Sequence, residues 1–377
     1  MSRPQPIQVA DRHAFDTVID ARSPAEFALD HIPGAINCPV LDDEERRIVG
    51  TLYKQEGAFE ARRVGAAMVA ANLARHLRGP LADRPAHWRA LVYCWRGGMR
   101  SGSMVTWLRL VGWDAQPLAG GYKSWRNHVI AQIEAIAPRL DLRVICGPTG
   151  SAKTRVLEAL QAQGAQTLDL EGLARHRGSM LGALPGVQQP AQTGFETALA
   201  EALERIDLQR PVFIEAESAR IGRLSVPPAL VRRLRASRCI EVQASAAARL
   251  AFLLRDYAHL GEDRSALVEL LAGFKELHGR ATIERWQGWA DALALEALYA
   301  ELIERHYDPL YARSQRQHLS QWALRHSVQA QDLLPEAIEA LARQIRERFD
   351  GAQGAQSAQS AGVAPVSPTL PPGSTGT

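Results

Sequence analysis

Cysteine, lysine and long apolar runs are all scarce in this chain of 377 residues. The four cysteines lie far apart and form no C-x-x-C pair, which argues against a zinc site and against a disulfide framework. No apolar run approaches the roughly 20 residues that span a bilayer, and the opening MSRPQPIQVADRH lacks the apolar core of a signal peptide. We therefore expect a cytoplasmic protein with no membrane partner and no structural metal.

Lysine is rare even among the basic residues, because the 44 lysines and arginines include only four lysines. These are Lys54, Lys123, Lys153 and Lys275. Arginine suits phosphate contacts, but genome composition can produce the same preference for arginine over lysine. The preference therefore does not indicate a phosphate-containing ligand. The net charge of +3 is too small to indicate a nucleic-acid partner. The length fits about two domains, and the 46% hydrophobic and 23% charged content is that of a soluble globular protein.

The first part of the chain alternates strand and helix signals. Residues 17–40 predict a strand, a short helix, a Pro-Gly turn and a second strand. The other predicted elements are a helix at 63–77, a buried strand at 90–94, a helix at 101–112 closed by Gly112, and a strand, Gly-Gly turn and helix over 115–133. This alternation predicts a parallel sheet with helices on both faces, forming an α/β domain over residues 1–137.

The pattern restarts near Pro138 and predicts a second α/β domain over residues 138–350. Its expected elements are a strand at 142–147, a helix ending at Gly164, strands at 167–170 and 211–217, and a helix followed by a strand over 227–244. After about residue 245 the pattern is almost entirely helical. Residues 351–377 are of low complexity and cannot bury a core, so we predict a disordered tail.

A single thiol stands at the end of an apolar run in LVYCWRGGMRS, residues 91–101. The amides of a helix N-terminus stabilise an anion, and glycines let a loop turn its amides inward. Such surroundings favour the thiolate, so Cys94 is predicted to be a reactive nucleophile rather than a buried core cysteine. The predicted anion loop comprises Arg96, Gly97, Gly98, Arg100 and Ser101.

The stretch VICGPTGSAKTRVL is a Walker A pattern between a strand and a helix. Its amides would wrap a phosphate chain, Lys153 would contact the terminal phosphates and Thr154 would hold Mg²⁺. The predicted diphosphate or nucleotide site comprises Gly147, Gly150, Ser151, Lys153 and Thr154. Ala152 stands where glycine is usual, which puts rapid ATP hydrolysis in doubt but leaves the phosphate site.

Other residues are candidates to support this phosphate site. Glu215 and Glu217 end an apolar strand, where a Walker B acid or simply a solvated strand end would lie. The segment 169–179 follows another strand and is a candidate to bring His176, Arg177 and Ser179 to the phosphates. The basic stretch 230–238 is more typical of a solvated helix face than of a tRNA-binding patch.

The other three cysteines, Cys38, Cys146 and Cys239, lie in or at the ends of apolar strands and are expected to pack in the core. His31, in DHIPGA, is expected to be a turn and packing residue.

Three strings together resemble the rhodanese domain: DARSPAEFALDHIPGAINCPV, CWRGGMRS and LAGGYKSW. The resemblance implies that Cys94 carries sulfur or selenium. Cys94 to Arg100 spans seven residues, as in the phosphatase branch of the fold, whereas simple sulfurtransferases use six. Loop length therefore leaves open a cysteine phosphatase or an arsenate reductase-like enzyme with a regulatory nucleotide-binding domain. A sulfurtransferase with such a domain is another alternative. A noncatalytic nucleotide sensor is a further alternative.

A rhodanese domain followed by a P-loop domain resembles bacterial tRNA 2-selenouridine synthases over residues 1 to about 350. The strings that carry the resemblance, in order, are YCWRGGMRS, DLEGLARHRGS, QPAQTGFE, EAESARIG and HYDPLYARS. The resemblance implies a transferase that converts 2-thiouridine at the tRNA wobble position to 2-selenouridine. It further implies two steps, in which geranyl diphosphate first alkylates the sulfur and selenium from selenophosphate then displaces the geranylthio group.

We hypothesise a role for each loop in this chemistry, because the resemblance does not by itself assign geranyl diphosphate to the phosphate loop. Cys94 would bear selenium as a perselenide while its loop and arginines receive the selenophosphate anion. Residues 147–154 would cradle the diphosphate of geranyl diphosphate, with Lys153 and Mg²⁺ assisting its departure. The helices after residue 245 would supply a groove for the prenyl chain or bind the anticodon arm.

Overall fold

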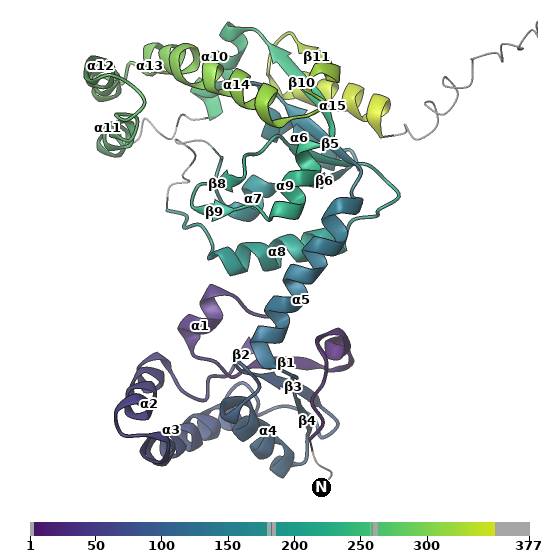
Figure 1. The fold of residues 1–377 in the computed structure, drawn as a ribbon, viewed down its shortest axis with the longest axis vertical. Helices are drawn as coiled ribbons and strands as arrows, with labels where there is room; N and C mark the ends of the chain where they lie inside the picture. Colours follow the sequence, from purple (N-terminus) through teal and green to yellow (C-terminus); the bar gives the residue numbers. More distant parts are fainter. Residues whose placement is uncertain (1–3, 179–181, 183–185, 257, 259–262, 351–377) are drawn as a thin grey trace, which may run out of the picture.

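The computed structural model describes residues 4–178, 182, 186–256, 258 and 263–350. Figure 1 shows two α/β parts along the long axis of the molecule, with one long helix running from the first part to the second. Ser179 and the predicted tail at 351–377 lie outside the described residues. Among the described helices, none combines the length and apolarity that crossing a bilayer requires.

The first part is a parallel four-stranded sheet of order β2-β1-β3-β4. Its strands are β1 (Thr17–Asp20), β2 (Ile36–Asn37), β3 (Arg89–Tyr93) and β4 (Asp114–Pro117). Its helices are α1 (Pro24–Leu29), α2 (Asp43–Gln55), α3 (Ala58–Arg78), α4 (Met99–Val111) and α5 (Gly121–Ile136), with a 3₁₀ turn at Val9–Ala14. This confirms the predicted α/β order, and Gly112 ends α4 in a left-handed conformation as expected. The helix starts two residues before the predicted position, so Ser101 lies in its first turn.

The second part is a parallel five-stranded sheet of order β11-β10-β5-β7-β6. Its strands are β5 (Leu142–Cys146), β6 (Gln166–Leu168), β7 (Val212–Glu215), β10 (Arg238–Ala244) and β11 (His326–Ala330), and a small antiparallel pair is formed by β8 (Arg220–Ile221) and β9 (Leu224–Ser225). The prediction of an almost entirely helical chain after residue 245 missed β11. This strand is short and only one of its residues is fully buried, so its sequence carries little signal; pairing with β10 stabilises it.

The helices of the second part pack around its sheet. They are α6 (Lys153–Ala162), α7 (Leu170–Ala174), α8 (Gln192–Glu204), α9 (Pro228–Arg235), α10 (Ala246–Asp256), α11 (Arg264–Ala272), α12 (Arg280–Asp291), α13 (Leu295–Leu302), α14 (Asp308–His318) and α15 (Pro335–Phe349). Short 3₁₀ turns occur at Ala137–Arg139 and Trp322–Leu324, and a π-helical turn at Ile303–Tyr307 precedes α14.

One apolar cluster continues from the first sheet into the second. Leu91 and Tyr93 of β3 belong to the same cluster as Val144 of β5 and Phe195 of α8. Helix α5 contributes Trp125, Val129 and Ile133 to it and packs against α8. Burial of apolar surface therefore stabilises the arrangement of the two parts as well as each part.

Candidate functional site

The predicted nucleophile lies between a buried strand and a helix N-terminus. Cys94 follows β3, and α4 begins after Gly98. Its side chain is only 3% exposed, and its Sγ lies 3.2 Å from Ser101 Oγ. The backbone N–H groups of Gly98 and Ser101 also donate to the sulfur. The thiol is thus buried, but it faces donors rather than apolar side chains alone.

These donors decide the ionisation of Cys94. Burial raises the pKa of the thiol, but hydrogen bonds from the Ser101 hydroxyl and from the Ser101 and Gly98 amides lower it, as does the charge of Arg100. The net result is a pKa below the ordinary thiol value of 9.0. A lowered pKa favours the thiolate, which is the nucleophilic form.

The two predicted arginines have different surroundings. Arg100 Nη1 donates to Glu26 Oε2 at 2.6 Å, and Glu26 itself completes the capping box of α1. Arg100 is therefore held in place and part of its charge is compensated. Arg96 is exposed beside the loop.

The Gly120-Gly121 turn at the start of α5 packs against the backbone of the cysteine loop. Gly121 has φ +62°, and a Cβ there would lie 2.3 Å from the Cys94 carbonyl oxygen. The Tyr122 N–H donates to the Cys94 carbonyl at 2.8 Å, and the Lys123 N–H to that of Trp95 at 3.1 Å. Sequence reasoning quoted LAGGYKSW for its resemblance but missed this contact, because nothing in the string specifies its distant partner.

The phosphate loop connects β5 to α6, as the Walker A pattern predicts. Lys153 Nζ donates to the Gly147 carbonyl at 2.9 Å, so the lysine folds over the loop. The Gly147 N–H donates to the Tyr311 hydroxyl of α14. Ser151 is fully buried, and its hydroxyl has no partner among the described residues.

Ala152 adopts a conformation that glycine normally supplies. Its φ and ψ are 59° and 28°, in the left-handed region, and its side chain is 4% exposed. This conformation is strained for an L-residue with a Cβ. The departure from the Walker A pattern therefore leaves the loop shape in place and stores strain at one residue.

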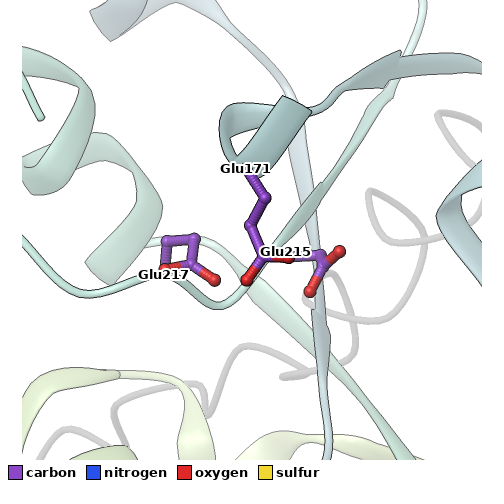
Figure 2. A group of neighbouring side chains, drawn as sticks. All are labelled: Glu171, Glu215 and Glu217. Carbon is purple, nitrogen blue, oxygen red and sulfur yellow. The ribbon is translucent and has the colours of Figure 1, made fainter. Parts of the chain in front are cut away.

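Three carboxylates converge beside the phosphate loop (Figure 2). Glu171 lies in the first turn of α7, Glu215 ends β7, and Glu217 follows two residues later. One carboxylate oxygen from each of the three lies within 4.8 Å of those from the other two. Thr154 Oγ1 donates to Glu171 Oε2 at 3.4 Å. Sequence reasoning named Glu215 and Glu217 but missed Glu171, although DLEG after a strand was an available signal.

The cluster is electrostatically unfavourable without a cation. Burial, with the charges of Glu215 and Glu217, raises the pKa of Glu171 to about 10. Burial raises the pKa of Glu215 to about 7 against the lowering effect of Lys153. Glu215 Oε1 is buried with no partner among the described residues. Carboxylate and hydroxyl oxygens are ligands that Mg²⁺ prefers, so this set fits a divalent cation next to phosphates.

A cavity of about 750 Å³ next to the phosphate loop is lined on one part by polar and on another by apolar side chains. Its polar lining includes Lys153, Thr154 and the three glutamates. Its other lining residues include apolar and aromatic side chains, mainly from α10 and α14: Phe252, Leu253, Tyr307, Leu310, Tyr311 and Leu319. Such a cavity accommodates a ligand with a charged head and an apolar tail.

The predicted site residues therefore separate into two groups. Gly150, Lys153, Thr154, Arg177, Glu215 and Glu217 line the cavity. Gly147, Ser151 and His176 are not among the lining residues, and His176 Nδ1 accepts from the Gly178 N–H at 3.1 Å. The cavity-lining residues run from Thr149 to Leu319, so Cys94 and its predicted anion loop are not among them.

The remaining sequence predictions concern packing. Cys38, Cys146 and Cys239 are buried and unpaired, as expected. His31 stacks on Phe27 at 3.8 Å between ring centroids and binds its carbonyl, which confirms a packing role.

Two family models match the chain. The rhodanese-like domain matches residues 6–128, and the tRNA 2-selenouridine synthase AAA domain matches residues 140–281. The first match covers the cysteine loop and the second covers the phosphate loop and the three glutamates.

Curated relatives match across both parts. A tRNA 2-selenouridine synthase of Nitrosomonas europaea is 41% identical over 244 residues, which is 64% of this chain and 63% of the relative. The chain thus aligns with just under two thirds of that protein's length. Proteins with the same name from Alcanivorax borkumensis and Cupriavidus necator are each 36% identical, over 78% and 80% of this chain and 88% and 89% of the relatives.

Proposed function

The chain belongs to the tRNA 2-selenouridine synthase family, and from that premise we propose that it replaces the sulfur of 2-thiouridine at the tRNA wobble position with selenium in two steps at two sites. Geranylation takes place in the cavity at the phosphate loop. Selenation takes place at Cys94. This assignment of the two steps rests on one observation: a single cavity is lined by the phosphate loop, by carboxylates and by apolar side chains.

Geranyl diphosphate fits that cavity by chemistry, since its head is anionic and its tail is a branched hydrocarbon. The sulfur of 2-thiouridine attacks C1 of the geranyl group, the C1–O bond breaks, and diphosphate leaves with the electron pair. Lys153 and the loop amides stabilise the negative charge that develops on the leaving group. Thr154 and the three glutamates would hold Mg²⁺, which would supply further charge neutralisation.

Selenation needs an electrophilic C2 and a bound selenium donor. The alkylated sulfur is a better leaving group than a thione, so it departs as geranylthiolate when selenium adds. The amides before α4, Arg96 and Arg100 receive the selenophosphate anion. Water takes the phosphoryl group as phosphate, the P–Se bond breaks, and selenide is released. Selenide attacks the Cys94 sulfur of a mixed disulfide between Cys94 and a small thiol, and that thiol leaves, so the disulfide is the oxidant and Cys94 carries the selenium as a perselenide. The perselenide attacks C2 as geranylthiolate leaves, and a small thiol then attacks the Cys94 sulfur, which releases 2-selenouridine and restores the mixed disulfide. Assays must therefore contain a small thiol and its disulfide.

The test uses two variants and two substrates. Lys153→Ala should abolish geranylation of thiolated tRNA by geranyl diphosphate, while still selenating a tRNA that is already geranylated. Cys94→Ser should show the reverse. Mass spectrometry of the wobble nucleoside measures both products. If either variant loses both steps or neither step, the two-site proposal is wrong.

A further inference from the structure

A large aromatic side chain is exposed directly beside the buried thiol. Trp95 follows Cys94 in the chain and is 45% exposed, whereas Cys94 is 3% exposed. Exposing an indole forgoes the free energy of burying it. The position of this ring, next to the atom that is proposed to carry selenium, points to a partner that covers it during the reaction.

The indole rests on a rigid support. Its ring centroid lies 5.3 Å from that of Tyr122, with the planes tilted by 36°. The Tyr122 hydroxyl donates to Asp30 Oδ2 at 2.7 Å, and the guanidinium of Arg22 lies 3.8 Å from the Tyr122 ring centroid. Arg22 is in turn fixed by Asp20 at 2.6 Å. A preorganised aromatic surface loses little conformational entropy when it binds a planar ligand.

Positive charge flanks this surface. Arg96 follows Trp95 in the chain and is exposed. Lys123 is also exposed, and its backbone N–H donates to the Trp95 carbonyl at 3.1 Å. Exposed aromatic rings beside cations are the combination with which proteins bind unstacked bases of single-stranded RNA.

We propose that Trp95 is the stacking surface for the wobble base during selenation, with Arg96 and Lys123 contacting the flanking phosphates. This inference rests on the proposed function and deepens it by naming how the base is held at Cys94. The base leaves the stack of the anticodon loop and lies on the indole. C2 is thereby brought to a thiol that is itself almost inaccessible.

The test compares two tryptophans of equal exposure. Trp107, on α4, is also 45% exposed and provides the matched control. Selenium transfer to geranylated tRNA should fall by about 5- to 150-fold in Trp95→Ala, the loss expected for one stacked base, and should largely return in Trp95→Phe. Trp107→Ala should transfer at the wild-type rate. Alkylation of Cys94 by iodoacetamide should proceed at the same rate in all variants.

A binding measurement tests this inference independently of selenium transfer. An anticodon stem-loop RNA containing 2-geranylthiouridine should bind Trp95→Ala more weakly than Trp107→Ala. If wild-type Cys94 takes up no selenium but this difference in binding remains, only the proposed function is overturned. Arg96→Ala and Lys123→Ala should each make the dependence of log Kd on log salt shallower by about 0.7. Unchanged transfer and binding in Trp95→Ala would overturn the inference, as would a parallel loss of Cys94 alkylation.

Discussion

Two buried cysteines in the same part of the molecule differ because of their neighbours. Burial raises the pKa of Cys38 to about 11, with only the charge of Arg84 lowering it. Cys94 is also buried, yet the donors that face it hold its pKa below the usual thiol value. We therefore expect hydrogen bonds to the charged form, rather than exposure, to make Cys94 more reactive than Cys38.

Ser101→Ala tests this explanation. The variant removes the hydroxyl that lies 3.2 Å from the Cys94 sulfur and leaves both amides in place. The thiol pKa should rise, so the pH profile of alkylation by iodoacetamide should move to higher pH. At neutral pH the alkylation rate should fall about tenfold, which is the scale of one hydrogen bond to a charged group. Cys38→Ala should leave the profile unchanged, and an unshifted Ser101→Ala profile would contradict the explanation.

Ala152→Gly tests the strain in the phosphate loop. The left-handed conformation at φ 59° is strained for alanine but not for glycine, whereas glycine gains entropy in the unfolded chain. We expect a net stabilisation of up to about 1 kcal/mol, measured by urea denaturation. Ala159→Gly, in the body of α6, is the control, and it should destabilise by about 1 kcal/mol. Destabilisation of the same size at both positions would show that Ala152 is not strained.

At the scale of elements, the local patterns that predict strands and loops predicted most of the two sheets. β3 and β5 are apolar runs followed by glycine-containing loops, so both loops were recognisable before the structure was known. The strand β11 depends on its partner β10, and the contact between Gly121 and the cysteine loop depends on tertiary packing. The DLEG string placed Glu171 after a strand, but its approach to Glu215 and Glu217, more than 40 residues away in the chain, depends on the same tertiary packing.

The junction of α7, β7 and the phosphate loop should respond to pH and to Mg²⁺. The pKa of Glu215 is about 7 in the folded protein and near 4.5 when unfolded, so the native state binds more protons and its stability falls as pH rises between these values. Glu215→Gln should therefore be more stable than the wild type at pH 8, by about 1–3 kcal/mol, and similar to it at pH 4. Thermal denaturation at the two pH values measures this difference.

Magnesium provides the complementary arm of that experiment. Added Mg²⁺ should raise the Tm of the wild type at pH 8, because it binds the native cluster, and should raise that of Glu215→Gln less. Glu284→Gln, which alters an exposed ion pair, should behave like the wild type. Equal Mg²⁺ stabilisation of all three proteins would argue against a cation at the carboxylate cluster.

At the scale of the whole molecule, the continuous apolar cluster makes the two parts depend on each other. A polar connection adds to it, since Arg126 of α5 donates to Asp30 at 3.4 Å and also pairs with Glu196 of α8. Its Nη1 donates to the Thr193 carbonyl and to Thr197 Oγ1, each at 3.1 Å. The side chain is 11% exposed, so this network is largely shielded from water.

Arg126→Ala should weaken the coupling between the two parts. The change leaves the buried carboxylate of Asp30 and that of Glu196 without their cation, which costs about 2–4 kcal/mol for a largely buried pair. The wild type should unfold in one calorimetric transition, whereas the variant should unfold at lower temperature in a broadened or split transition.

Arg280→Ala is the control for this prediction. It removes an ion pair whose arginine is 90% exposed and should change the free energy of unfolding by less than about 0.5 kcal/mol. Since α5 also begins at the turn beneath the cysteine loop, a loosened α5 should slow Cys94 alkylation as well. A variant that keeps a single unshifted transition would show that the apolar cluster alone couples the two parts.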